Sequence, residues 1–195
     1  SPEPSIFRLH NMNWKDAAEY FNQGIKTFKE ALDHQNEVFS NKKGTPKKKP
    51  YRQAKYEVEN LPTFIDKPKV SAWLAKLQYP LYLFDFETYQ SPLPLFDNSW
   101  PYEQTTFQYS VHVANDLKEE PEHREFLAED PKKDPRRALT EKLIKDLGEN
   151  GSIIVYSQSF EKGHLRELAD IFPEHKDKIL AIVDRIVDLR DVFSK

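Results

Sequence analysis

Apolar residues recur along the chain in two patterns, one typical of β-strands and one typical of helices. Alternating or continuous apolar runs predict strands at residues 81–88, 106–114, 124–128, 152–156 and 187–193. Apolar residues spaced three and four apart predict helices at residues 14–39, 68–77, 134–147, 159–172 and 175–186. From residue 81 onward the predicted order is three strands, a helix, a strand, two helices and a strand. This order is typical of an α/β fold with meandering strands first and crossover helices afterwards.

The segment 81–88, Leu-Tyr-Leu-Phe-Asp-Phe-Glu-Thr, begins as a buried strand and ends in two acids separated by one residue. Because side chains alternate along a strand, its three aromatic residues share one face. Asp85 and Glu87 share the other face with Leu81 and Leu83. Carboxylates at the end of a core strand are costly unless a cation compensates them, and divalent metal ions take such oxygen ligands. The alternative, which spacing leaves open, is that both acids protrude into solvent.

The N-terminal part is predicted to be helical and basic. Residues 14–39 are expected to form one amphipathic helix that begins after an Asn13 cap and packs against the main domain, a partner helix or another part of the protein. Residues 41–50 hold five lysines, two prolines and a glycine, which predicts a loop. The lysines attract phosphates, but no aromatic residue is interleaved to stack bases, so we favour a solvated linker. Residues 51–65 are interpreted as an extended connection.

Composition and charge narrow the class of protein. The chain has 195 residues, a net charge of −3 and no cysteine, which excludes disulfides and thiolate metal sites. Residues 1–80 hold 14 Lys/Arg against 9 Asp/Glu, whereas residues 81–195 hold 15 against 23. This asymmetry indicates either a polyanion-gripping arm joined to a carboxylate-rich metal site or two ordinary solvated surfaces. No apolar run is long enough to span a membrane, so we expect a cytoplasmic protein without membrane partners.

A further acid, Glu161, falls in the first turn of the predicted helix 159–172. If strand 152–156 pairs in parallel beside strand 81–88, this helix begins over the carboxyl end of the earlier strand. Glu161 would then face Asp85 and Glu87 across one crevice. The alternative is that Glu161 only complements the helix dipole, and the residue alone does not decide between the two.

These motifs together resemble known families. Phe84-Asp-Phe-Glu-Thr88 resembles the first motif of the DEDD exonucleases of the ribonuclease H-like superfamily, and Ser157-x-x-Phe-Glu161 is similar to their second motif, Asn-x-x-Phe-Asp. Several segments resemble, in order, a bacterial family catalogued as domain of unknown function 2779; they are residues 79–88, 100–102, 107–110, 156–168 and 187–189. The resemblance covers residues 79–193, and nothing comparable is found in the first 70 or so residues.

The resemblance implies a ribonuclease H-like mixed sheet, with three antiparallel strands extended by parallel strands, flanked by helices. It divides the chain into a helical extension, residues 1–78, and an exonuclease-type domain, residues 79–195, expected to be truncated at its C-terminus. It implies a 3'-5' exonuclease that hydrolyses DNA or RNA, with Asp85, Glu87 and Glu161 as catalytic metal ligands. Two divalent ions, Mg²⁺ or Mn²⁺, would activate a water and stabilise the leaving oxygen.

The departures from the exonuclease pattern define an alternative. Ser157 replaces the usual Asn, Glu161 replaces Asp, and the fourth acid expected on a later helix does not occur before Lys195. Asp188 resembles a position that is generally structural in these enzymes and has only a minor chance of being a ligand. The alternative function is a catalytically inactive ribonuclease H-like module that binds nucleic acid or protein through the basic loop and the 14–39 helix.

Overall fold

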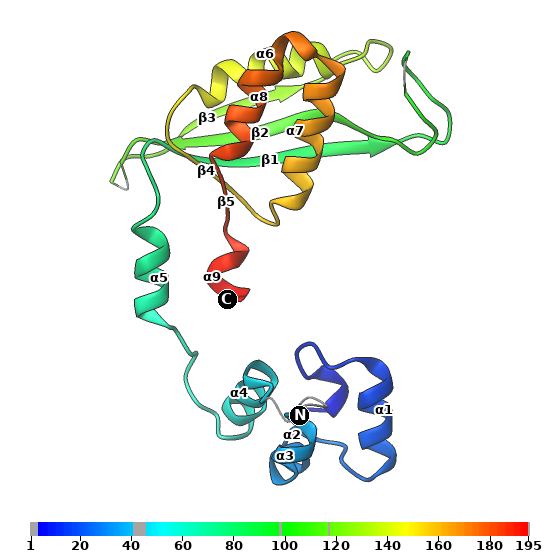
Figure 1. The fold of residues 1–195 in the computed structure, drawn as a ribbon, viewed down its shortest axis with the longest axis vertical. Coiled ribbons are helices and arrows are strands. Elements are labelled where there is room, and N and C mark those ends of the chain that lie inside the picture. Colours follow the sequence, from blue (N-terminus) through cyan, green and yellow to red (C-terminus); the bar gives the residue numbers. More distant parts are fainter. Residues whose placement is uncertain (1–3, 41–45, 98, 117, 195) are drawn as a thin grey trace. The chain divides into compact units, whose positions relative to one another are not determined.

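The computed structural model describes residues 4–40, 46–97, 99–116 and 118–194 (Figure 1). The chain forms two compact units, Ser1–Ile65 and Asp66–Lys195. The second unit therefore begins earlier than the predicted boundary at residue 79, since the helix that precedes the first strand belongs to it. In the described part of the chain, no helix is both long and apolar enough to cross a membrane.

The first unit is built from short helices around a small core. The helices are η1 (Ile6–Arg8), α1 (Trp14–Asn22), α2 (Phe28–Asp33), α3 (Gln35–Val38) and α4 (Lys48–Val58). The buried residues of its core are Ile6, Leu9, Ile25, Phe28, Ala31, Val38, Phe39 and Ala54. These side chains come from η1, α2, α3, α4 and the segments between them, and the partly buried Tyr20 of α1 packs against them, so the helices share one core.

The prediction of one helix over residues 14–39 is wrong. The chain turns at Gly24, whose φ of +96° favours glycine, and α2 restarts with a capping box in which Thr27 and Glu30 satisfy each other's backbone N–H groups. The apolar face expected of an amphipathic helix is incomplete as well, because Trp14, its first apolar residue, is 75% exposed. The cap itself is confirmed: the Asn13 side chain accepts a 2.8 Å hydrogen bond from the Asp16 N–H.

The prediction of an extended connection over residues 51–65 is wrong for its first half. Residues 48–58 form α4, which packs against α2 through the fully buried Ala54. The Gln53 side chain fixes the helix further, because it accepts from the His10 N–H at 2.7 Å and donates to the Arg8 carbonyl at 3.1 Å. The buried face of α4 consists of Pro50 and Ala54, which are too small and too few to give a strong apolar period.

The second unit contains a five-stranded mixed sheet. Its strands are β1 (Leu81–Gln90), β2 (Gln104–Ala114), β3 (Glu122–Leu127), β4 (Ser152–Val155) and β5 (Ile186–Asp188). They lie in the order β3-β2-β1-β4-β5. Neighbours among β1, β2 and β3 are antiparallel, whereas β4 is parallel to β1 and β5 to β4. The predicted α/β class and the parallel pairing of β4 beside β1 are confirmed.

Helices cover one face of this sheet. The helices of the unit are α5 (Lys67–Leu74), α6 (Arg136–Leu147), α7 (Ser159–Ile171), η2 (Pro173–His175), α8 (Lys176–Asp184) and α9 (Arg190–Ser194). Figure 1 shows α6, α7 and α8 together on the same side. The aromatic side chains of β1 form the core against these helices, as predicted. On the other face Leu83 is 47% exposed, so the expectation that β1 begins buried on both faces holds only for Leu81.

The predicted final strand, residues 187–193, is wrong in its second half. β5 ends at Asp188, and α9 follows after a single residue. Asp188 causes this change of direction, because its carboxylate accepts a 2.9 Å hydrogen bond from the Arg190 N–H at the start of α9. A side-chain acceptor two residues upstream of an N–H favours a turn over an extended strand.

Candidate functional site

Asp85 and Glu87 lie on the exposed face of β1, as the alternation predicts. Asp85 is paired with Ser110 across the β1–β2 ladder, and Glu87 with Gln108. The register then shifts by one residue, because Thr88 is paired with Thr106 and Phe107 is left as an extra residue on β2. Such a β-bulge bends the strand and re-aims nearby side chains, and bulges are frequent beside active sites.

Glu161 is buried at the start of α7, where only 2% of the residue is exposed. Its Oε2 atom is buried and accepts no hydrogen bond from the described residues. Burial, with the negative charges of Asp85 and Asp188 as smaller causes, raises the pKa of Glu161 to about 7. Glu161 is therefore a buried carboxyl with a raised pKa, and one of its oxygens lacks a donor among the described residues.

Asp188 holds the turn that leads into α7. Its carboxylate accepts hydrogen bonds from the N–H groups of Ser157 and Gln158, both at 3.0 Å. Ser157 needs such support because its φ is +73°, a conformation that non-glycine residues rarely adopt. Burial alone would raise the pKa of Asp188, but the backbone donors and the Arg190 charge outweigh it and lower the pKa overall. Asp188 therefore holds the turn from which α7, with Glu161 in its first turn, begins.

The structure brings some of the predicted site residues within electrostatic range and not others. The charge of Asp85 is one of the causes that raise the pKa of Glu161, so these two acids lie within electrostatic range of each other. Glu87 shares the exposed face of β1 but does not contribute to that pKa. Across the described residues, no three His, Cys, Asp or Glu side chains are grouped closely enough to hold a metal ion. The donors available to a cation are carboxylate oxygens, which suit Mg²⁺ or Mn²⁺.

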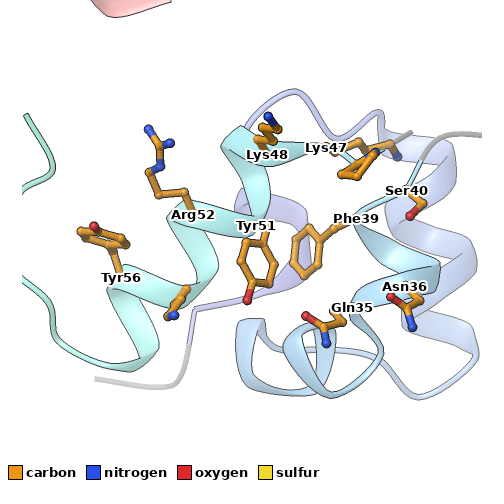
Figure 2. Close-up of a pocket in the computed structure, with 11 residues that line it drawn as sticks. Gln35, Asn36, Phe39, Ser40, Lys47, Lys48, Tyr51, Arg52 and Tyr56 are labelled. Atoms are coloured by element: carbon orange, nitrogen blue, oxygen red, sulfur yellow. The ribbon is translucent and has the colours of Figure 1, made fainter. Parts of the chain in front are cut away.

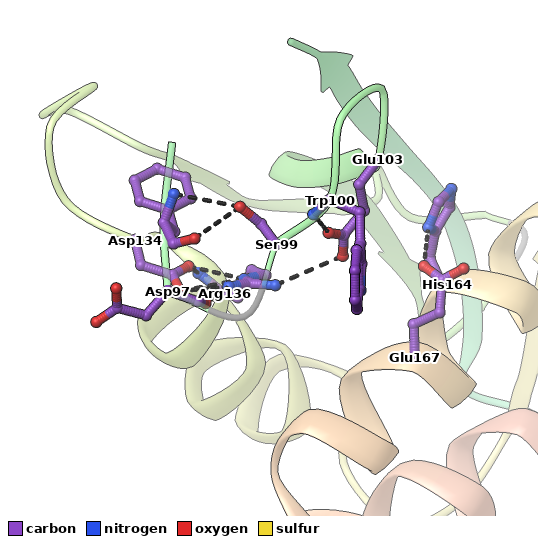
Figure 3. A network of polar contacts seen from close by, with 9 residues as sticks. Asp97, Ser99, Trp100, Glu103, Asp134, Arg136, His164 and Glu167 are labelled. Carbon is purple, nitrogen blue, oxygen red and sulfur yellow. Dashed lines mark hydrogen bonds and ion pairs between the residues drawn. The ribbon is translucent and has the colours of Figure 1, made fainter. Parts of the chain in front are cut away.

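His164 is a residue beside the site that the sequence analysis did not single out. It lies one helical turn after Glu161 and is 5% exposed. Its ring meets Phe160 edge-on at 4.6 Å and Phe86 edge-on at 6.4 Å between ring centroids. Its Nδ1 atom lies 2.8 Å from the Glu167 carboxylate, a contact drawn as a dashed line in Figure 3. The three-residue spacing from Glu161, which places both on one helix face, was the available signal.

Arg136, also missed, anchors the long loop between β1 and β2 (Figure 3). The guanidinium is 5% exposed and donates to the Asp134 carboxylate through Nε and Nη2, at 2.9 Å and 2.7 Å. Nη2 also donates to the Asp97 carbonyl at 3.3 Å, and Nη1 lies 3.7 Å from the Glu103 carboxylate. The hydrogen bonds that Arg136 donates to the Asp134 carboxylate are the largest cause that raises the pKa of Arg136, so the cation stays charged.

The anchored loop presents aromatic side chains to solvent. Glu103 accepts a 2.7 Å hydrogen bond from the Trp100 N–H, which ties the loop to Arg136. Trp100 is 75% exposed and Tyr102 is 67% exposed. The two rings therefore do not cover the core, and they remain available to contact a ligand.

The family model of domain of unknown function DUF2779 matches residues 82–195, more than half of the chain. The chain belongs to the DUF2779 family. The matched DUF2779 region contains β1 through α9 and includes Asp85, Glu87, Glu161 and Asp188. The resemblance to this family that the sequence motifs indicated is confirmed.

Relatives of this DUF2779 protein occur in Mycoplasma and Ureaplasma species. Uncharacterized protein MG366 of Mycoplasma genitalium is 35% identical over 128 residues, 61% of this chain and 19% of the relative. Its homolog in Mycoplasma pneumoniae is 30% identical over 64% of this chain and 20% of the relative. Uncharacterized protein UU173 of Ureaplasma parvum is 33% identical over 61% of this chain and 18% of the relative. The chain thus spans about a fifth of these relatives, and no solved structure matches it.

Proposed function

We propose that the DUF2779 domain is a metal-dependent nuclease that hydrolyses phosphodiester bonds of DNA or RNA. The observation that carries the proposal is the environment of Glu161, a buried carboxyl with an unpartnered oxygen that faces the charge of Asp85. Strongly perturbed acids of this kind concentrate at functional sites. A divalent cation between the two carboxylates would supply the missing partner and remove their repulsion.

The proposed site takes its acids from two elements. Asp85 and Glu87 project from the exposed face of β1, and Glu161, in the first turn of α7, lies close enough to Asp85 for that charge to raise its pKa. Divalent ions bound there would supply an activated water and stabilise the leaving oxygen. The chain itself contributes oxygen ligands, and Glu161 must lose its proton before it can serve as one. We therefore expect activity to increase with pH until the Glu161 carboxyl is ionised.

The sheet supports the ribonuclease H-like part of the proposal. Three antiparallel strands extended by two parallel strands are what the exonuclease resemblance implies. The second candidate function is a catalytically inactive module that binds nucleic acid or protein. It is favoured by the absence, among the residues described, of a group of three side chains arranged to hold a metal ion.

Calorimetric titration with Mn²⁺ and a cleavage assay distinguish the two functions. We expect the full chain to bind Mn²⁺, and Asp85→Asn and Glu161→Gln each to weaken that binding. Cleavage of labelled single-stranded DNA or RNA should fall at least about 100-fold in both variants, because even outer-shell partners of metal ligands cost about 10- to 100-fold. The matched control is Asp170→Asn at the exposed, opposite end of α7, which should behave like the wild type.

Each outcome of these assays has a definite meaning. Cleavage that survives Asp85→Asn would exclude the catalytic assignment of β1. If the wild-type protein neither binds Mn²⁺ nor cleaves the strands, the proposal of a nuclease is refuted and the catalytically inactive binding module remains as the candidate function. Equal losses in Asp170→Asn would show that charge near α7, and not a ligand set, controls the activity.

A further inference from the structure

A basic groove of about 390 Å³ lies in the first unit between the end of α3 and the first turns of α4 (Figure 2). Its volume falls in the range of about 300–1,000 Å³ that is usual for ligand sites. Four lining residues are cationic, namely Lys47, Lys48, Arg52 and Lys55, and none is acidic. Within the described ranges, no ion pair involves any of these four cations. Their charges are therefore available to an anionic ligand.

The start of α4 gives a second reason to expect an anionic ligand in this groove. The helix begins at Lys48 without a side-chain cap and without an acid in its first turn. Three consecutive lysines, residues 47–49, thus stand at the positive end of the helix dipole, where cations are unfavourable. A phosphate beside these lysines would offset both their mutual repulsion and their repulsion from the dipole.

Aromatic side chains form the apolar part of the groove. Phe39, which is 3% exposed, is its floor, and the half-buried Tyr51 ring meets Phe39 edge-on at 5.5 Å between centroids. Farther along α4, the half-buried Tyr56 ring meets Phe64 edge-on at 6.1 Å. The Arg52 guanidinium lies 3.8 Å from the centre of the Phe64 ring. Cations that follow a backbone beside rings on which bases stack are the combination used by single-strand binding proteins.

We propose that this groove binds single-stranded nucleic acid, with phosphates on Lys48, Arg52 and Lys55 and bases against Tyr51 and Tyr56. The identity of the ligand rests on the proposed function, because a strand gripped here would be the substrate polymer of the nuclease. The binding itself needs no metal ion. An adjoining hollow that shares Ser40 and Lys47 is lined by three acids, Asp16, Glu19 and Glu37. Those acids repel phosphate, so the strand follows α4 from Lys48 toward Lys55.

This groove revises the interpretation of residues 41–50 as a solvated linker. The objection was that no aromatic residue is interleaved with the lysines. The fold supplies the rings from both sides of the run, since Phe39 precedes it and Tyr51 follows it. Lys42 and Lys43, which belong to the same run, lie outside the described residues.

The test is fluorescence anisotropy with labelled oligo(dT) and oligo(U), using the full chain at low salt in EDTA. The double variant Lys48→Gln/Arg52→Gln removes two exposed charges from the groove. We expect it to weaken binding at least about tenfold and to reduce the salt slope by about 1.4, since each phosphate contact to a single strand contributes about 0.7. The matched control Lys15→Gln/Lys29→Gln removes two exposed charges elsewhere in the same unit and should change binding less than about twofold.

Stacking is tested separately with Tyr56→Leu, which keeps an apolar group but removes the ring. It should weaken oligo(dT) binding about fivefold or more and leave binding of an abasic strand unchanged. Comparison of oligo(dT) with oligo(U) identifies which polymer the groove prefers. Circular dichroism of each variant verifies that the helices remain folded.

Three results would overturn the proposal: no binding by the wild type, equal binding by the groove variant, or an equal loss in the Lys15/Lys29 control. Failure of the nuclease is distinguishable from failure of the groove. If Asp85→Asn binds strands normally but the wild type cleaves none, the nuclease proposal fails and the groove stands. If the wild type cleaves strands but the groove variants bind and cleave equally well, the groove proposal fails alone.

Discussion

The raised pKa of Glu161 predicts an unusual dependence of stability on pH. The ordinary pKa of a glutamate is 4.5, and folding raises that of Glu161 to about 7. Between these values the folded state binds more protons than the unfolded state, so the free energy of unfolding must decrease as pH rises. Linkage gives a loss of up to about 2 kcal/mol between about pH 5.5 and pH 8 from this group alone.

The variant Glu161→Gln isolates this loss of unfolding free energy, because every other acid titrates both in the wild type and in the variant. Gln has nearly the shape of the protonated carboxyl, so the variant should match the wild type only below about pH 4, where Glu161 is protonated in the folded and the unfolded state. The variant should be more stable by about 1.4 kcal/mol at about pH 5.5, and its advantage should grow by about a further 2 kcal/mol up to about pH 8, since the wild type then buries a charge close to Asp85. Addition of Mn²⁺ at high pH should stabilise the wild type and not the variant.

The assay is urea unfolding in EDTA across the pH range, followed by NMR at the amides of β1 and β4. These strands belong to the unit that holds Glu161, so unfolding of the first unit does not enter the measurement. Carbon-13 NMR of the Glu161 carboxyl measures its pKa directly. A stability difference between wild type and variant that does not change with pH would refute the reasoning.

Two further predictions concern the packing that supports the site. Tyr109→Phe removes the buried 2.7 Å hydrogen bond from the Tyr109 hydroxyl to the Asp146 carboxylate, which should cost about 1–3 kcal/mol in the urea unfolding of the second unit. Gly151→Ala should lower the melting temperature of that unit strongly, because φ is +90° there and the new Cβ would collide with the Pro80 carbonyl. Gly163→Ala at the half-buried Gly163, where nothing lies within 4 Å of a new Cβ, is the matched control and should leave the melting temperature unchanged or raise it.

The elements of the second unit were predictable because one core dictates their patterns. The aromatic residues of β1 alternate with exposed ones since one face of the sheet packs against α6, α7 and α8. Leu165 and Leu168 recur along α7 for the same reason and are buried as predicted. Apolar periodicity reports burial against a single surface, and here each element has only one such surface.

Apolar periodicity failed to predict the helices of the first unit because part of the core of that unit consists of small residues. Ala31 and Ala54 are fully buried where α2 packs against α4, yet neither stands out in an apolar pattern. Gly24 and the Thr27–Glu30 capping box were readable signals of a break between helices. They were outweighed by apolar residues that continued at helical spacing on both sides of the turn.

The spacing of the residues identified the acids of the candidate site, but it did not indicate their burial or their pKa values. Alternation along β1 places Asp85 and Glu87 on one face, but nothing in the first turn of α7 indicates that Glu161 is almost completely buried. The difference arises because the α7 N-terminus is held against the sheet by Asp188, which lies far along the chain. A perturbed pKa is a property of such tertiary packing and cannot be derived from local sequence.

The proposed nuclease site and the proposed nucleic-acid groove together explain the uneven distribution of charge along the chain. The excess of basic residues in the first half includes the four cations of the groove along α4, and the acidic half holds the carboxylates of β1 and α7. A nuclease needs both, because a polyanion must be gripped by cations while its scissile phosphate approaches acids that would otherwise repel it. Divalent ions bound at the acids would remove the repulsion between the carboxylates and the phosphate. The metal titration therefore tests the acidic site, and the binding assay in EDTA tests the basic groove.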